Sequence, residues 1–212
     1  TQPGITIDNL NRHLSKYGLF FTPDPSTSSR ANVGGAIGNN SCGAHSILYG
    51  KTVDQVLEME IILSNGNKIL CAENSLNELK TKLSLQSFEG LVYKRVVDIS
   101  TQAAPEVKSR YPKILRRIGG YNLDLIHQSE PVNLSKIIVG SEGTLASVSE
   151  AKLKLETIPK VKAVSIFHFD NIYKSMEASA EILRENPAAV EHIGHMIIQQ
   201  ARQSLGFSKN LT

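Results

Sequence analysis

The segment from Pro23 to Gly50 constrains the fold of this chain most, because its composition makes a poor helix and a poor strand. It contains five glycines together with adjacent asparagines, serines and prolines, and few large apolar side chains. Glycine permits positive φ and a close approach of the backbone to a ligand, whereas proline fixes φ and removes a donor. Apolar helical and strand-like patterns flank the segment. We therefore expect an ordered loop whose N–H groups and amides can face a bound cofactor.

Length and composition indicate a globular protein. The 212 residues suffice for one domain plus part of a second, and 41% hydrophobic and 20% charged residues are ordinary proportions. The net charge of +3 is too small to indicate nucleic-acid binding. No run has the length of a transmembrane helix, and no signal sequence is evident. Cys42 and Cys71 form neither a disulfide framework nor a metal-ligand spacing, so we expect a reducing, cytoplasmic location.

The first half of the chain predicts a helix and a hairpin. Apolar residues recur at helical spacing over 7–17, between Thr6 as a plausible N-cap and Gly18. Alternating runs at 57–63 and 68–71 flank Asn65-Gly66, which predicts a hairpin with a type I′ turn.

A helical region is expected next. Ser75 and Glu78 form a capping-box pattern, and helical spacing continues through 88–99. Pro105 and Pro112 punctuate the segment that follows. This segment is basic, which most often marks a solvated helix face, although it can also face an anionic ligand or a carboxylate; its cations are Lys108, Arg110, Lys113, Arg116 and Arg117.

The last third predicts strands around a second glycine turn. Residues 136–139 read as a short buried strand, Gly140–Thr144 as a tight turn, and 145–155 as a half-buried antiparallel strand. Two glycine loops suggest two walls of one ligand site. Beyond 160 we expect a strand at 161–169, then two helices, the first stopped by Pro187 and the second over 190–205.

Other motifs give weaker signals. The Gly34-Gly35-Ala36-Ile37-Gly38 run is not a dinucleotide-binding G-x-G-x-x-G, and no phosphate-binding G-x-x-x-x-G-K-[ST] occurs, so both of those classes are disfavoured. His192 and His195 have a helical spacing that metal ligands can use, but such pairs more often pack or face solvent, and we predict no metal site.

Several of these residues together resemble a known family. The segments that carry the resemblance are Pro23-Asp24-Pro25-Ser26, Val33-Gly34-Gly35, Gly38–Gly43, His45-Ser46, Tyr49-Gly50, Gly120–Asp124 and Gly140–Leu145. They are similar to the vanillyl-alcohol-oxidase-type flavoproteins, and within these to FAD-linked D-2-hydroxyacid dehydrogenases. The closest likeness is to bacterial members that are fused to a C-terminal iron–sulfur region.

The resemblance implies an α+β fold with a mainly antiparallel sheet flanked by helices. Residues 1–159 would form the second FAD subdomain, and residues 160–212 the truncated strand–helix–helix beginning of a substrate-cap domain. The start at Thr1 suggests a cut inside a larger protein. The first subdomain, which cradles the pyrophosphate, and the iron–sulfur cysteines would then lie outside the chain. The fragment by itself is expected to be inactive.

The same resemblance implies the site residues. Those assigned to FAD are Pro23, Asp24, Ser26, Val33, Gly34, Gly35, Asn39, Gly43, Ser46, Gly50, Gly140, Glu142, Gly143 and Val148. Arg116 or Arg117 is the candidate partner of a substrate carboxylate, since guanidinium groups pair with carboxylates bidentately. No catalytic residue can be named, because these residues are expected to lie mostly outside the chain.

The implied activity is oxidation of a D-2-hydroxyacid, such as D-lactate, glycolate or D-2-hydroxyglutarate, to the 2-oxoacid. The implied partners are that substrate and an electron acceptor, without nucleic acid or a transmembrane segment. The parent would be cytoplasmic, or peripheral at the inner face of the membrane, and the fragment could form a homodimer. Two alternatives stay open: a non-catalytic nucleotide- or anion-binding module, and a flavin-dependent reductase of a cell-wall sugar nucleotide, which would not explain Gly120–Asp124.

Overall fold

The computed structural model describes residues 1–127 and 131–204. The chain divides into two compact units, Thr1–Pro159 and Lys160–Thr212. The first unit contains α1 (Ile7–Ser15), β1 (Leu19–Phe20), α2 (Val33–Gly38), α3 (Ser46–Tyr49), α4 (Thr52–Gln55), β2 (Val56–Ile62), β3 (Lys68–Cys71), β4 (Glu73–Asn74), α5 (Leu76–Ser84), α6 (Phe88–Arg110), α7 (Leu123–His127), β5 (Val132–Asn133), α8 (Ser135–Ile138), β6 (Ser147–Leu153) and β7 (Glu156–Thr157). The second contains α9 (Ile172–Arg184) and α10 (His195–Gln203).

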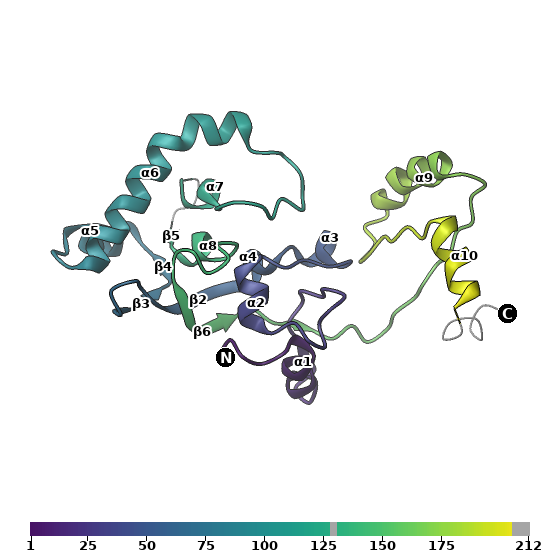
Figure 1. Cartoon of the computed structure of the whole chain (residues 1–212), viewed down its shortest axis with the longest axis horizontal. Helices are drawn as coiled ribbons and strands as arrows, with labels where there is room; N and C mark the ends of the chain where they lie inside the picture. Colours follow the sequence, from purple (N-terminus) through teal and green to yellow (C-terminus); the bar gives the residue numbers. More distant parts are fainter. Residues whose placement is uncertain (128–130, 205–212) are drawn as a thin grey trace. The chain divides into compact units, whose positions relative to one another are not determined.

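A three-stranded antiparallel sheet is the centre of the first unit. Its strand order is β3-β2-β6, and two-stranded pairs β1-β7 and β4-β5 accompany it. Within this unit α7 packs against α6, and α8 contacts both α7 and β2 (Figure 1). The predicted α+β class, with antiparallel sheets flanked by helices, is confirmed.

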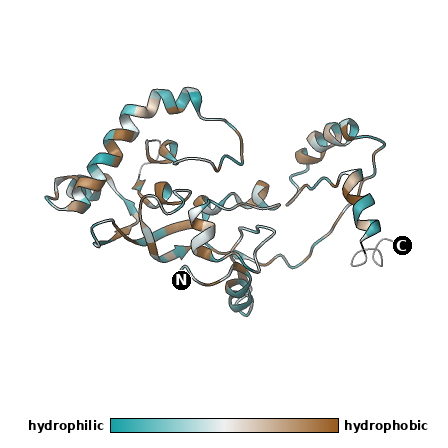
Figure 2. Cartoon of the chain, in the orientation of Figure 1, coloured by the Kyte–Doolittle hydropathy of each residue, from teal (hydrophilic) through white to brown (hydrophobic). Residues whose placement is uncertain are grey.

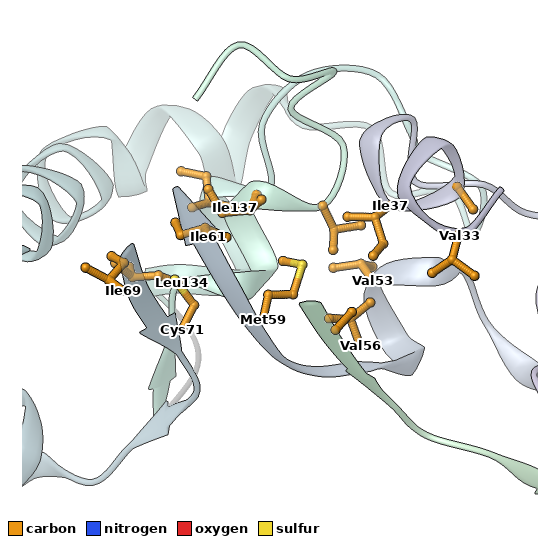
Figure 3. Packing of buried hydrophobic residues seen from close by; sticks show 14 of the residues in the cluster. Val33, Ile37, Val53, Val56, Met59, Ile61, Ile69, Cys71, Leu134 and Ile137 are labelled. Atoms are coloured by element: carbon orange, nitrogen blue, oxygen red, sulfur yellow. The ribbon is translucent and has the colours of Figure 1, made fainter. Parts of the chain in front are cut away.

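The hydrophobic core lies where α2, α4 and α8 cover the sheet. Met59 and Ile61 of β2 are buried together with Val33 and Ile37 of α2 and Ile137 of α8 (Figure 3). In Figure 2, β2 is hydrophobic along much of its length, whereas α1 is mostly hydrophilic. Burial of these apolar side chains is the main force that holds α2 and α8 on the sheet.

The helix at 7–17 and the hairpin are present, with small corrections. The helix ends at Ser15, and Gly18 has a φ of 70° just beyond it. In the hairpin, Ile61 pairs with Ile69, but Gly66 alone has positive φ between the strands. The predicted type I′ turn is therefore wrong: Gly66 N donates to Leu63 O, and Leu63 N to Asn67 O, so the connection is longer than two residues.

Three predictions failed where short local patterns were ambiguous. The Pro23–Gly50 segment contains two short helices, and the first, α2, begins at the N-cap Asn32. A strand was predicted over 136–139, but Ser135–Ile138 form the helix α8, because a short apolar run has no periodicity that separates the two states. Pro105 lies inside α6 rather than after it, so the helix extends to Arg110.

The other elements of the first unit agree with the sequence. The Ser75–Glu78 capping box opens α5, with both of its reciprocal hydrogen bonds present. The strand predicted over 145–155 is β6, and it pairs with β2. A register shift between Val56 and Glu58 turns Leu57 outward, so Leu57 leaves the buried face that the alternation predicted.

The second unit differs from its prediction in one element. Residues 161–169 form no strand, and Val161 and Val164 are exposed, because within the described part of the unit no other strand pairs with this segment. The helix capped by Asn171 is α9. The second helix, α10, is shorter than predicted, and the end of that prediction at Leu205 lies outside the described residues.

Candidate functional site

The two glycine loops, far apart in sequence, meet at the C-terminal end of α2. Gly140 N donates to Ile37 O at 2.9 Å, and Glu142 N donates to Gly38 O at 3.0 Å. A Cβ at Gly140 would lie 3.4 Å from Asn40 Cβ, so the contact is close. The second turn is therefore attached directly to the first loop, and the two form one continuous surface.

The second turn has an uncommon backbone. Gly140 and Gly143 have φ values of 87° and 74°, and Glu142 between them has a φ of 53°. A non-glycine residue in the left-handed region costs about 1–3 kcal/mol and persists only where its surroundings enforce it. Here the bond from Glu142 N to Gly38 O supplies part of that enforcement.

Asn122 anchors the chain just before this turn. Its buried Nδ2 donates to Lys136 O at 3.1 Å and to Val139 O at 2.9 Å, at the two ends of the segment that precedes Gly140. The neighbouring Tyr121 places Oη 2.8 Å from Thr144 Oγ1. Sequence reasoning used the Gly120–Asp124 run as a family marker and missed its role as a support. The available signal was an amide side chain two residues after a pair of glycines.

Asn40 lies beneath the junction of the loops. It is fully buried, has a φ of 51°, and its Oδ1 accepts from Val53 N at 2.9 Å. Its Nδ2 has no hydrogen-bond partner among the described residues. An unpaired buried donor costs about 1–3 kcal/mol. Sequence reasoning assigned the neighbouring Asn39, which is exposed, and missed Asn40.

Gly43 is enclosed by the first loop itself. Its N–H donates to Ser46 Oγ at 2.9 Å, and its carbonyl accepts from Arg116 Nη2 at 2.8 Å. Asp24 packs directly against Gly43. Its Oδ2 atom lies 2.6 Å from Nδ1 of His45. Gly43, Asp24 and Ser46 therefore hold one another in place within the loop.

The residues predicted to bind FAD differ widely in exposure. Those with exposed surface in the loops are Ser26, Gly35, Asn39, Glu142 and Gly143. The half-buried ones are Asp24, Gly34, Gly43, Gly50 and Val148, and the buried ones are Pro23, Val33, Ser46 and Gly140. The exposed set can touch a ligand directly, whereas the buried set shapes the surface from below. Val148 lies on β6 opposite Ile61.

The two candidate substrate arginines have different surroundings. Arg117 donates from Nη2 to Asp124 Oδ1 at 2.6 Å, and its guanidinium carbon lies 4.6 Å from the centre of the Tyr111 ring. Arg116 is exposed and its observed contact is with Gly43 O. Their role toward a substrate stays a prediction.

Lys136 ties α8 to the start of the sheet. Its Nζ donates to Val53 O at 2.8 Å and Val56 O at 3.0 Å, and burial lowers the pKa of this amine. Two carbonyl acceptors compensate the partly desolvated ammonium, so we assign Lys136 a structural role beneath the loops.

The loop surface has features that suit a large, flat cofactor. Gly143 would meet no atom within 4 Å even with a Cβ added, so its backbone is open to a ligand. Gly35 is exposed, but an added Cβ there would lie 3.1 Å from Asn32 Oδ1, so glycine leaves space that a side chain would fill. The orphaned Asn40 donor adds a polar group close by. These residues fit FAD, which would supply the redox chemistry when bound. Across residues 1–127 and 131–204 no cluster of three His, Cys, Asp or Glu side chains could hold a metal ion, and no helix there could cross a membrane.

Comparison with known proteins finds a family whose model matches the part of the chain that contains the first glycine loop. Residues 1–72, which include the whole first glycine loop, match the family described as FAD binding domain. The predicted relation to FAD-binding proteins is thereby confirmed.

The particular relatives are D-2-hydroxyacid enzymes, as the resemblance predicted. D-2-hydroxyglutarate dehydrogenase from Escherichia coli (strain K12) is 31% identical over 96% of this chain and 20% of the relative. Glycolate oxidase subunit GlcD from Bacillus subtilis (strain 168) is 26% identical over 91% of this chain and 31% of the relative. The chain thus spans about 20% of the length of the D-2-hydroxyglutarate dehydrogenases that it matches. Among solved structures, alkyldihydroxyacetonephosphate synthase has 21% identity over 76% of this chain and 19% of that chain, with a TM-score of 0.44, which is too low to define the fold.

Proposed function

We propose that this chain supplies part of the FAD site of a flavin-dependent D-2-hydroxyacid dehydrogenase. The observation that carries the proposal is the junction of the two glycine loops, in which Gly140 and Glu142 bond to the end of α2. The match of residues 1–72 to an FAD binding domain supports the cofactor, and the hydroxyacid relatives support the substrate class. In this proposal Thr1–Pro159 is the second FAD subdomain, and Lys160–Thr212 begins the cap.

The chain's own residues would bind and orient the cofactor. Exposed backbone at Gly35 and Gly143 would lie against it, and Asn39 and Glu142 would offer polar groups at its edge. Arg116, which is exposed beside Gly43, would pair with the substrate carboxylate. FAD, when bound, would supply the two-electron oxidation that converts the hydroxyacid to the 2-oxoacid, and this chain's residues would hold and orient the reactants.

The decisive experiment uses the full-length protein that contains this chain. We expect it to purify with bound yellow flavin and to reduce an electron-accepting dye with D-lactate, glycolate or D-2-hydroxyglutarate. A colourless protein without flavin absorbance would overturn the proposal. Retained nucleotide or anion binding without flavin would instead favour the non-catalytic binding module.

The 212-residue chain alone gives a separate result. We expect it to fold but to bind FAD weakly or not at all, because the resemblance assigns the pyrophosphate contacts to another subdomain. Titration with FAD, followed by quenching of flavin fluorescence, measures this affinity. A dissociation constant below about 1 μM would contradict the expectation.

The resemblance also supports finer proposals about the full protein. The full-length protein would pass electrons to iron–sulfur centres in a C-terminal region. It would be located in the cytoplasm, or peripherally at the inner face of the membrane. Exposed apolar residues such as Ile114 and Leu115 could support a homodimer of the chain. Iron analysis of the full protein tests the iron–sulfur proposal, and an active enzyme without iron would refute it. Sedimentation of the chain tests the homodimer, and a strictly monomeric chain would refute it.

A further inference from the structure

A cavity of about 360 Å³ lies in the first unit, beside the glycine loops. It is bounded by the end of α6, the segment 111–117, the start of α7 and the residues around Lys51. Four cations and two carboxylates line it: Lys51, Lys108, Lys113, Arg117, Asp54 and Asp124. Apolar side chains of α6, α7 and the segment 111–117 form the remaining wall.

The charges of this cavity do not balance. Asp124 pairs with Arg117 at 2.6 Å, and Asp54 lies 3.7 Å from Lys51 Nζ. Lys108 and Lys113 have no carboxylate within 4.0 Å among residues 1–127 and 131–204. The cavity therefore carries two positive charges that its own carboxylates do not compensate.

Two of the cations are held in fixed positions. Arg117 stacks on the Tyr111 ring, and both of its recorded bonds leave from Nη2, to Asn122 and Asp124. Its other N–H groups make no recorded bond within the described residues. Lys51 Nζ donates to Leu115 O at 3.1 Å, and its side chain is 17% exposed. The immobilised guanidinium can therefore bind an anion at little further entropic cost, and bidentate pairing with a carboxylate suits its shape.

We propose that this cavity binds a small organic dicarboxylate. The two uncompensated lysines match two negative charges, and Arg117 matches a planar carboxylate. The apolar wall suits a carbon skeleton better than a bare inorganic ion. A volume of about 360 Å³ is at the small end of the range for ligand sites. The site needs no flavin, so the proposal stands or falls independently of the proposed dehydrogenase activity.

Binding here has a direct structural route to the glycine loops. Asn122 lines the cavity and also holds the carbonyls of Lys136 and Val139, just before Gly140. Lys51 directly follows Gly50, at the end of the first loop. Occupation of the cavity should therefore order the residues that position the second turn.

The test uses the 212-residue chain without flavin and succinate as the probe, measured by calorimetry. We expect saturable one-to-one binding in the millimolar range, because both rim lysines are exposed to solvent. The double variant Lys108→Glu/Lys113→Glu should weaken it at least about tenfold. The matched control Lys80→Glu/Lys94→Glu changes the net charge equally at exposed positions outside the cavity, and it should leave binding unchanged.

Three outcomes would overturn the proposal. These are no saturation with succinate up to about 50 mM, equal losses in both double variants, or propionate or inorganic phosphate binding as tightly as succinate. A third variant, Arg117→Lys, keeps the charge but loses the planar fork, and it should weaken the binding of succinate. Circular dichroism of each variant confirms that it is folded, and a variant that is not folded is replaced by the milder Lys108→Gln/Lys113→Gln pair.

Discussion

Substitution of Gly43 by alanine tests the packing of the first glycine loop. An added Cβ would lie 2.1 Å from Asp24 Oδ1, 2.2 Å from Asp24 O and 2.5 Å from Asp24 C. Two of these three atoms belong to the backbone, so rotation of a side chain cannot relieve the clash. Asp24 is also held by its 2.6 Å contact with His45, and its movement would disturb that pair. Overpacking of this kind costs about 1–3 kcal/mol, and we expect the upper end, about 3 kcal/mol.

Two further glycines separate crowding from backbone strain. Gly119 has ordinary φ and open space around it, so Gly119→Ala should change the free energy of unfolding by less than about 0.5 kcal/mol. Gly66 has open space but a φ of 83°, so Gly66→Ala should cost about 1–2 kcal/mol from strain alone. At Gly43 an added Cβ would be crowded but φ is not positive, so any destabilisation of Gly43→Ala reports crowding alone.

Urea denaturation of the three variants, monitored by circular dichroism, gives the free energies of unfolding. The expected order of destabilisation is Gly43→Ala, then Gly66→Ala, then Gly119→Ala. If Gly43→Ala stays within about 0.5 kcal/mol of the unsubstituted chain, the loop can move away from Asp24 and the reasoning is refuted.

Three other predictions concern single side chains. Asn122→Ala should lower the free energy of unfolding by about 2–4 kcal/mol in urea denaturation, because two backbone carbonyls lose their donor; a loss below about 1 kcal/mol would contradict this role. Burial raises the pKa of the Cys71 thiol to about 12, so with rising pH the unfolded chain loses this proton before the folded chain does. The stability that is present below about pH 9 should therefore fall between pH 9 and 12. In alkaline denaturation profiles Cys71→Ala should flatten that fall, and an unchanged slope would contradict the prediction. Ser75→Ala removes the cap of α5 and should cost about 1 kcal/mol in thermal unfolding, whereas the exposed Ser84→Ala serves as the control.

The sequence predicted the elements that carry their own local signals. The helix after Thr6, the β2–β3 hairpin and the Ser75 capping box each combine a periodic pattern with a cap or turn residue. The segment 161–169 shows the opposite case, since its alternation marks a strand only when another strand pairs with it. The short helix α8 likewise depends on tertiary packing, with Lys136 bonded to two carbonyls at the start of the sheet.

The candidate site was predictable as a list of residues but not as an arrangement. Glycine content identified both loops, yet only the structure shows that Gly140 and Glu142 bond to the end of α2. The supporting amides Asn40 and Asn122 were missed, because their roles depend on burial and on partners more than ten residues away. Local sequence carries no signal for such long-range bonds.

The bonds between the second turn and α2 have a consequence for hydrogen exchange. Because Gly140 N and Glu142 N are bonded to Ile37 O and Gly38 O, their amides can exchange only when the turn separates from that helix. They should therefore exchange at the rate of α2, about a hundred residues earlier in the chain. The two loops would open and close as one cooperative unit, so a ligand that stabilises either loop would slow exchange in both.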